Sequence, residues 1–216
     1  MPEFSIESLD MHKAISYLGV DGNEESWSQF DGYHHAALKR LEASGADFAV
    51  IASNTPHHRF EAIVSGVGIP VIDIFEVTAK RCARIGVSKV LILGTSVTMN
   101  SLRLRNEFAK VGIEADGPKD ERMRFLTTRL IAALQAAEVE EATERLGDVA
   151  RTSFQTQFSG PPVVCLACTE LPLAFQDNSF EPTFEVDGVV YINTSIIHIE
   201  AAIQFAVQQA IVISNR

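Results

Sequence analysis

Short apolar runs that alternate with longer amphipathic stretches constrain the fold of this chain most. The runs are rich in β-branched residues, as in Asp47 to Ser53 and Lys89 to Gly94. This alternation is typical of repeated βα units, which build a parallel sheet flanked by helices. The sequence therefore predicts an α/β protein.

The same pattern predicts where the strands and the clearest helices lie. The predicted strands are Phe4 to Leu9, Asp47 to Ser53, Ile69 to Ile74, Lys89 to Gly94, Gly112 to Asp116, Pro162 to Cys168 and Val189 to Asn193. One helix is predicted from Glu24 to Ser44, ending at Gly45, a residue typical of helix C-termini. Lys119 to Gln157 is predicted to form two helices with a break near Ala136 to Glu140.

Four of these strands end in similar residues, which indicates an internal repeat. The four ends are Ala52-Ser53-Asn54-Thr55, Leu93-Gly94-Thr95, Ala167-Cys168-Thr169 and Ile192-Asn193-Thr194. We therefore expect two pseudo-symmetric lobes with a cleft between them, the first lobe from residues 1–88 and 195–216 and the second from residues 89–194. No segment of the first lobe corresponds to Lys89 to Thr95, so its first βα unit is expected to lie before Met1.

Composition excludes several classes of partner. Acidic residues outnumber basic ones by 28 to 18, for a formal net charge of -10. Binding to nucleic acid or to anionic lipid needs clustered Lys and Arg, so we expect neither partner. The longest apolar runs are too short to cross a bilayer, and the first residues do not resemble a signal peptide. Three cysteines are too few for a disulfide scaffold, and we expect a cytoplasmic protein.

The carboxyl ends of parallel strands meet at one edge of a sheet, where ligands bind. Free N-H groups and Thr hydroxyls there can hold a small carboxylate without Lys or Arg. Cys168 precedes a predicted helix start, which we expect to lower the pKa of its thiol. Ser53 is its partner in the repeat. Two groups that face one cleft from two lobes could remove and return a proton on opposite faces of a carbon.

Structural alternatives accompany these interpretations. Ser53-Asn54-Thr55 could simply cap the helix that begins at Pro56. Cys165 is interpreted as a core residue, because strand residues three apart point to opposite faces and no second Cys pair completes a metal site. Glu170 is either a catalytic helper or a first-turn acid that favours the helix dipole. No nucleotide-binding glycine motif occurs, and we expect no metal or other cofactor.

At these motifs the chain resembles the aspartate/glutamate racemase superfamily, whose members are two-lobed enzymes without cofactor. The matching segments are ASNTPH at Ala52 to His57, LGTSVTM at Leu93 to Met99, LACTELPL at Leu166 to Leu173 and INTSIIHIEAA at Ile192 to Ala202. The resemblance implies that Cys168 and Ser53 occupy the two catalytic positions, Ser53 standing where most members have Cys. It implies substrate-binding roles for Asn54, Thr55, Thr95, Thr98 and Thr169. Thr194, expected to bind substrate, and His198, a possible helper, match the family's final motif. His57, four residues after Ser53 and one helical turn away, is expected to share the proton of the weakly acidic Ser53 hydroxyl.

Three hypotheses on function follow. The first is a racemase or epimerase of a small acidic amino acid, acting by proton abstraction and redelivery at the α-carbon. The second is a lyase or isomerase of a small dicarboxylate that uses Cys168 alone. The third is an inactive relative that only binds such ligands. A homodimer is also expected, because an incomplete first sheet would need covering.

Overall fold

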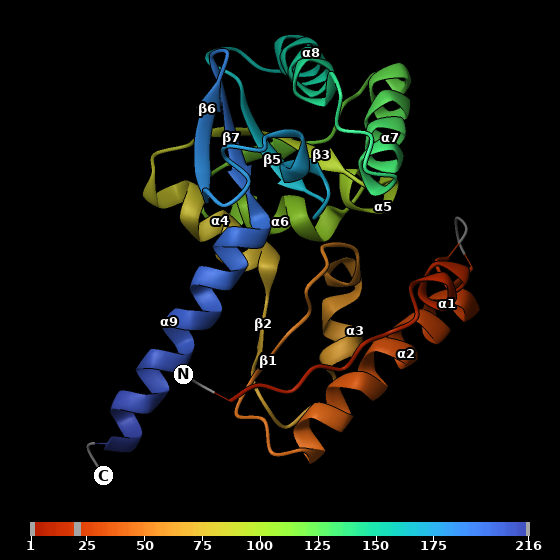
Figure 1. Ribbon diagram of the computed structural model, residues 1–216, viewed down its shortest axis with the longest axis vertical. Coiled ribbons are helices and arrows are strands. Elements are labelled where there is room, and N and C mark those ends of the chain that lie inside the picture. Colours follow the sequence, from red (N-terminus) through yellow and green to blue (C-terminus); the bar gives the residue numbers. More distant parts are fainter. Residues whose placement is uncertain (1–2, 20–22, 215–216) are drawn as a thin grey trace.

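The computed structural model describes residues 3–19 and 23–214, with side chains up to residue 209. Its elements form two layered lobes that are joined by a long helix at the carboxyl end of the chain (Figure 1). No helix within the described residues combines the length and the apolar character that a membrane crossing requires. The α/β class predicted from the sequence is confirmed.

The second lobe contains a five-stranded sheet in the order β4-β3-β5-β7-β6. Its strands are β3 (Lys89–Gly94), β4 (Glu114–Asp116), β5 (Val163–Ala167), β6 (Thr183–Val186) and β7 (Val189–Asn193). All neighbours pair in parallel except β6, which pairs antiparallel with β7. The sequence pattern did not predict β6, because its residues, TFEV, are few and only Phe184 among them is buried.

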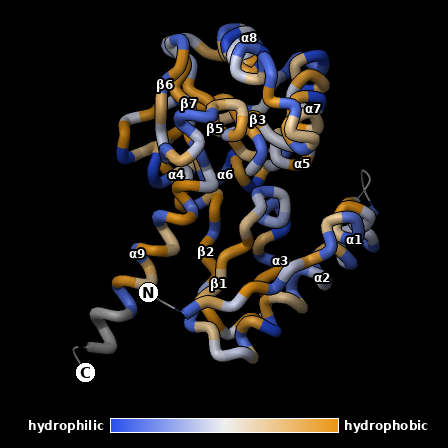
Figure 2. The backbone as a smooth tube through the Cα atoms, viewed as in Figure 1, coloured by the Kyte–Doolittle hydropathy of each residue, from blue (hydrophilic) through white to orange (hydrophobic). Residues whose placement is uncertain are grey.

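Side chains alternate between the two faces of this sheet. Leu91, Leu93, Val164 and Leu166 pack against α7 (Glu121–Gln135) and α8 (Ala142–Gln155). Val90, Ile92, Cys165 and Ala167 pack against α4 (Ile74–Arg84) and α6 (Leu102–Lys110). The central strands are therefore hydrophobic on both faces, whereas the helices are mixed (Figure 2). Cys165 is fully buried, which confirms its interpretation as a core residue.

Gly94, the last residue of β3, allows β3 and β5 to approach closely. A Cβ atom there would lie 2.5 Å from the carbonyl oxygen of Ala167 and 2.3 Å from Thr98 Oγ1. The Ala167 carbonyl belongs to the strand paired with β3, so it cannot move without disturbing the sheet.

We predict that Gly94→Ala lowers the free energy of unfolding by about 2–3 kcal/mol, because overpacking of this kind has costs in that range. Gly32→Ala is the matched control, since nothing lies within 4 Å of the added Cβ in α2 (Glu24–Ala43). That control should stabilise by roughly 0.5–1 kcal/mol through helix propensity. Urea unfolding of both variants tests the prediction, and equal stability of Gly94→Ala and the wild type would contradict it.

The first lobe is built on two short parallel strands, β1 (Ala49–Val50) and β2 (Val71–Ile72). Phe30 and Leu38 of α2 and Ile63 of α3 (Phe60–Val64) form its small core with Ala49. The helix α9 (Thr194–Ser214) starts at the end of β7 in the second lobe and runs beside this sheet (Figure 1). There the ring of Phe205 lies 4.9 Å from that of Phe48.

The predicted strand from Phe4 to Leu9 is wrong, since residues 3–10 form no regular element. Its counterpart in the repeat, β4, pairs only with β3. Among the described residues no strand of the first lobe corresponds to β3, so the strand with which Phe4 to Leu9 was expected to pair is not among them. Phe4 and Ile6 are accordingly 78% and 77% exposed.

The predicted helices are confirmed. The predicted helix from Glu24 is α2, and the pair predicted between Lys119 and Gln157 is α7 and α8. The lobe boundaries predicted at residues 88–89 and 194–195 stay a prediction. The remaining elements are α1 (Met11–Ser16), the 3-10 helix η1 (Thr55–Arg59), α5 (Ser96–Met99) and the 3-10 helix η2 (Leu171–Ala174).

Candidate active site

Hydrogen bonds join the strand ends of the two lobes. Asn54, which follows β1, donates from Nδ2 to Thr194 Oγ1 over 3.1 Å. Thr194, the first residue of α9, donates in turn to the Leu166 carbonyl over 2.8 Å. Since the Thr194 proton is used in that bond, its oxygen must accept from Asn54, which fixes the orientation of the Asn54 amide. The Asn54 Oδ1 atom is buried and has no hydrogen-bond partner among the described residues.

A second set of contacts is made by threonine hydroxyls. Thr55 Oγ1 lies 3.3 Å from Thr95 Oγ1, which lies 3.2 Å from Thr98 Oγ1. Thr55 and Thr95 are half-buried, whereas Thr98 is fully buried and donates to the Thr95 carbonyl over 3.0 Å. Thr55 and Thr95 can therefore reach a ligand directly. Thr98 instead orients Thr95 and the start of α5.

Cys168 follows β5 and is linked to Glu170. Its Sγ donates to Glu170 Oε2 over 2.9 Å, and the exposed Thr169 hydroxyl donates to the same oxygen over 3.0 Å. Gln135, at the end of α7, donates to the other carboxylate oxygen over 3.1 Å. Glu170 is therefore held in place beside the thiol, as expected of a helper that accepts the thiol proton.

The predicted lowering of the Cys168 pKa is wrong for this structure. Burial and the neighbouring Glu170 carboxylate raise the pKa of the thiol well above its usual range. The segment after Cys168 is the 3-10 helix η2, which has only four residues and so offers little helix dipole. Burial raises the pKa of Glu170, but hydrogen bonds from Cys168, Gln135 and Thr169 outweigh it and lower that pKa. The resting pair is thus a protonated thiol and a carboxylate.

Ser53 lies at the corresponding position after β1 and is half-buried. Its backbone N-H donates to the Ile51 carbonyl over 2.8 Å, and its hydroxyl has no hydrogen bond within the described part of the chain. The helix that follows, η1, has Asn54 at its N-cap position without any side-chain capping hydrogen bond. The capping alternative for Ser53-Asn54-Thr55 is therefore not supported.

The described hydrogen bonds of His57 go to groups other than Ser53. Its side chain is fully buried, with Nδ1 2.9 Å from Asp73 Oδ1 and Nε2 3.3 Å from the Ile51 carbonyl oxygen. Asp73 also forms an ion pair with Arg103 of α6. Burial raises the pKa of Asp73, but its bonds with His57 and Arg103 lower the pKa to about 2. His57 is thus held by a charged network at the junction of the two lobes.

Arg103 connects this network to three residues of the first lobe. It donates to the His57 carbonyl over 3.2 Å and pairs with Glu61 of α3 over 3.2 Å. Its guanidinium lies 4.8 Å from the centre of the Phe60 ring. Sequence reasoning missed both Asp73 and Arg103. Asp73 could have been found as a capping residue after a strand, since it caps α4 through Phe75 N-H, whereas nothing around Arg103 in the sequence marks it.

His198 is placed like His57, away from the thiol. It is 5% exposed, its Nε2 donates to the Ile72 carbonyl over 2.9 Å, and its ring lies 5.6 Å from that of His57. Burial lowers the pKa of His198 to about 4, despite the opposing hydrogen bond to Ile72. Among the described hydrogen bonds, none joins His57 or His198 to Ser53 or Cys168, whereas Glu170 is hydrogen-bonded to Cys168.

The lowered pKa of His198 predicts a pH-dependent stability. Unfolding returns the pKa to about 6.5, so the unfolded chain binds more protons between pH 4 and 6.5. The contribution of neutral, buried His198 to the free energy of unfolding is therefore complete above about pH 6.5. As the pH falls toward 4, the free energy of unfolding decreases by roughly 3 kcal/mol. His198→Gln should flatten this part of the curve, and replacing the exposed His12 by Gln should not. Urea unfolding at several pH values measures this pH dependence. Equal slopes of the free energy of unfolding against pH for His198→Gln and the wild type would contradict the prediction.

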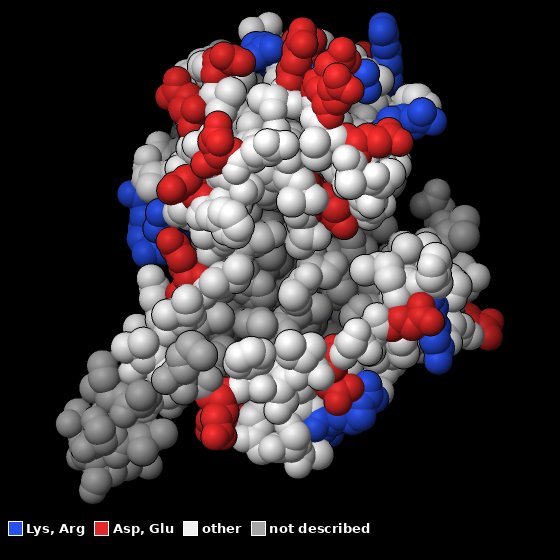
Figure 3. All heavy atoms as spheres, in the orientation of Figure 1, with Lys and Arg blue, Asp and Glu red and all other residues white. Residues whose placement is uncertain are grey.

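Few charged side chains lie on the visible surface around the site (Figure 3), although the buried pair of Asp73 and Arg103 lies at the junction of the lobes. Figure 3 shows Asp and Glu side chains gathered on the second lobe, whereas the visible surface between the lobes is mostly uncharged. In the described ranges, no three His, Cys, Asp or Glu side chains are grouped so that they could share a metal ion. The strand ends therefore offer hydroxyl, amide, thiol and carboxylate groups to a ligand.

Comparison with known proteins indicates similarity to amino-acid racemases. A family model described as Asp/Glu/Hydantoin racemase matches residues 5–202. The broad specificity amino-acid racemase RacX of Bacillus subtilis (strain 168) is 26% identical over 152 residues, which are 70% of this chain and 62% of RacX. The matched part of this chain thus spans less than two thirds of that relative's length.

Solved structures agree with the family model. An aspartate racemase homologue from Pyrococcus horikoshii OT3 superposes with a TM-score of 0.74 and 27% identity, over 95% of this chain and 84% of that one. Glutamate racemase from Francisella tularensis subsp. tularensis SCHU S4, in complex with D-glutamate, has a TM-score of 0.58 and 16% identity, over 82% of this chain and 63% of that one. The latter likeness shows the fold alone. The chain belongs to the Asp/Glu/hydantoin racemase family.

Proposed function

We propose that this protein is a cofactor-independent racemase or epimerase of a small acidic amino acid. In this proposal Cys168 is one acid/base group and Ser53 stands in the other catalytic position. The observation that carries it is the hydrogen bond from the Cys168 thiol to Glu170 at the end of β5. At the end of the neighbouring strand β7, Thr194 is hydrogen-bonded to Asn54 of the first lobe and to Leu166 of β5. Family membership supports the reaction class.

The proton path at Cys168 follows from this contact. When the thiol donates its proton to Glu170, the thiolate can take the α-proton of the substrate, and the electron pair stays on the substrate as a carbanion. In the reverse direction the neutral thiol returns a proton to that carbanion. Because the pKa of the thiol is raised, the neutral form predominates, which favours the proton-donating half of the reaction.

Substrate binding is assigned to the strand-end groups. Thr55, Thr95 and Thr169 have accessible or half-buried hydroxyls that can donate to carboxylate oxygens. A buried acceptor without a partner is costly, and the free Oδ1 of Asn54 would be satisfied by an α-ammonium group. This pairing supports an amino acid as the ligand. Thr194 holds Asn54 in position.

The test is proton NMR in deuterated water with the L and D forms of aspartate and glutamate. Loss of the α-proton signal for both enantiomers of one amino acid supports the racemase. Loss for one enantiomer alone means that only one face of the substrate is served. No loss for any of them removes the racemase proposal for acidic amino acids.

A second candidate is a lyase or isomerase of a small dicarboxylate that uses Cys168 alone. The observation that favours it is the contrast between the two catalytic positions, because Cys168 has Glu170 beside it whereas Ser53 has no base among its described contacts. A neutral thiol is suited to protonating the enolate left when a malonate-type acid loses carbon dioxide. Product analysis with malonate-type and maleate-type acids tests it, and absence of turnover counts against it.

A further inference from the structure

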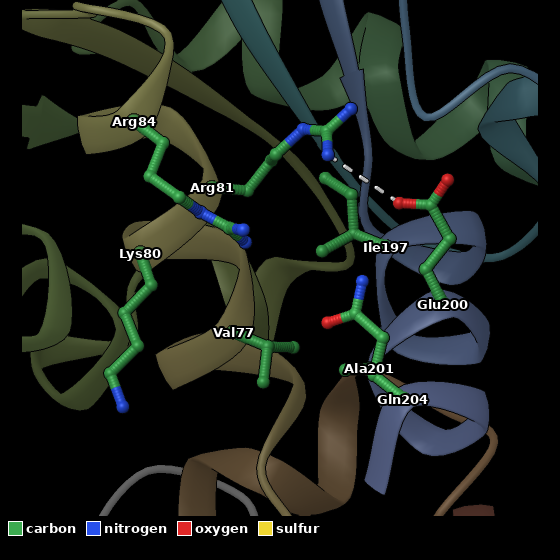
Figure 4. A pocket seen from close by; sticks show the side chains of 8 residues that line it. All are labelled: Val77, Lys80, Arg81, Arg84, Ile197, Glu200, Ala201 and Gln204. Atoms are coloured by element: carbon green, nitrogen blue, oxygen red, sulfur yellow. Dashed lines mark ion pairs between the residues drawn. The ribbon is translucent and has the colours of Figure 1, made fainter. Parts of the chain in front are cut away.

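A cavity lies between α4 and α9. Its volume is about 170 Å³, which is room for several water molecules or one small organic molecule. Eight residues line it: Val77, Lys80, Arg81, Arg84, Ile197, Glu200, Ala201 and Gln204 (Figure 4). The proposed catalytic mechanism uses none of them.

The cationic side of the cavity comes from one turn of α4. Lys80 is paired with Glu76, and Arg81 lies 3.6 Å from Glu200 of α9. Arg84 has no acidic partner among the described residues, and the buried Nε of Arg81 has no hydrogen-bond acceptor there. In a chain with a net charge of -10, this group of cationic side chains is a local region that favours an anion.

The shape of the cavity narrows the class of anion. In Figure 4 the Arg84 guanidinium and the Gln204 amide extend toward the space between the helices, whereas the Lys80 ammonium points away from it. Val77, Ile197 and Ala201 supply apolar surface in the same space. A ligand that contacts both the cationic and the apolar side chains has an anionic oxygen group and a short hydrocarbon chain. A bare inorganic anion would leave the apolar surface unused.

We propose that the cavity between α4 and α9 binds a small organic carboxylate, whose oxygens contact the Arg84 guanidinium and the Gln204 amide and whose hydrocarbon part contacts Val77 and Ile197. Its position links it to both lobes. The helix α4 follows β2 of the first lobe after one residue, Asp73, and α9 connects β7 with Phe48 of the first lobe through Phe205. An occupant would hold these two connecting helices together.

The experiment is a titration of the whole chain with sodium butyrate, followed by two-dimensional NMR of ¹⁵N-labelled protein. We expect saturable shifts of the Ala201 backbone amide and the Gln204 side-chain amide, and none with butyramide, which has the same shape without the charge. Arg84→Gln should weaken the binding at least about tenfold. Arg145→Gln removes another surface arginine, which pairs with Glu141 on α8, and should change nothing.

Three results would overturn the proposal: no saturable shift at Ala201 and Gln204, equal affinity in Arg84→Gln, or binding of inorganic phosphate without binding of butyrate. Shifts of Thr55 and Thr194 report separately on butyrate at the strand ends. Since the readout is binding and not turnover, failure of the racemase proposal would leave this test unaffected.

Discussion

Replacing Cys168 by alanine is expected to lower α-proton exchange by about a thousandfold, because a positioned acid/base group contributes on the order of 10²- to 10⁴-fold. Among the described residues, the Cys168 thiol at the end of β5 is the only acid/base group that is hydrogen-bonded to Glu170. Without it, Glu170 keeps its bonds from Gln135 and Thr169 but has no sulfur through which to pass a proton. The measurement is the same NMR exchange assay in deuterated water.

Two further variants make this result specific. Cys82→Ala removes another buried thiol, on the face of the large sheet opposite Cys168, and should leave exchange unchanged. Cys168→Ser keeps a donor for Glu170 but offers a much weaker acid, so it should be nearly as slow as alanine. Retention of exchange in Cys168→Ala, with the fold intact by circular dichroism, would remove Cys168 from the mechanism.

The pH profile should carry the same signature. Because burial and Glu170 raise the pKa of Cys168, the thiolate fraction grows steadily through the neutral and alkaline range. Exchange that depends on the thiolate should therefore rise with pH rather than level off near neutrality. Sequence reasoning could not foresee this, since Cys168-Thr169-Glu170 gives the order of residues but not that the carboxylate turns back onto the sulfur.

The fold could be predicted further than the site. Strands such as β3 and β5 are buried on both faces and read as continuous apolar runs, and the amphipathic pattern of α2, α7 and α8 identifies them directly. The strand at Phe4 was wrongly predicted because local pattern says nothing about whether a neighbouring edge exists. The strand β6 was missed because antiparallel pairing with β7 holds it in place, whereas its own sequence carries little strand pattern.

The repeated strand ends indicated a candidate site, but not the hydrogen-bond partners of its residues. Asn54 and Thr194 are 140 positions apart, and their hydrogen bond follows only from how the two lobes pack. His57 was predicted to assist Ser53 on the basis of helical spacing. In the structure the His57 ring is instead hydrogen-bonded to Asp73, 16 positions further on. A buried imidazole needs a polar partner, and Asp73 is held there by its ion pair with Arg103.

Ser53→Cys is expected to raise proton exchange by about a hundredfold for the amino-acid enantiomer whose α-proton faces the first lobe. A serine hydroxyl is a far weaker acid than a thiol, and among the described residues no hydrogen bond joins the Ser53 hydroxyl to a group that could share its proton. A thiol with an ordinary pKa of about 8.5 is already partly ionised near neutral pH. Ser53 is half-buried, so the larger sulfur can be accommodated.

Controls decide between the proposed functions. Ser96→Cys places a thiol at an exposed position at the start of α5 and should not change exchange. If Ser53→Cys raises exchange and adding Cys168→Ala removes exchange on the other face only, the two positions act on opposite faces of one substrate. If Ser53→Cys changes nothing while Cys168→Ala is inactive, Ser53 does not face the reacting carbon. The chemistry then belongs to Cys168 and Glu170 alone, which is the requirement of a lyase or isomerase and not of a two-base racemase.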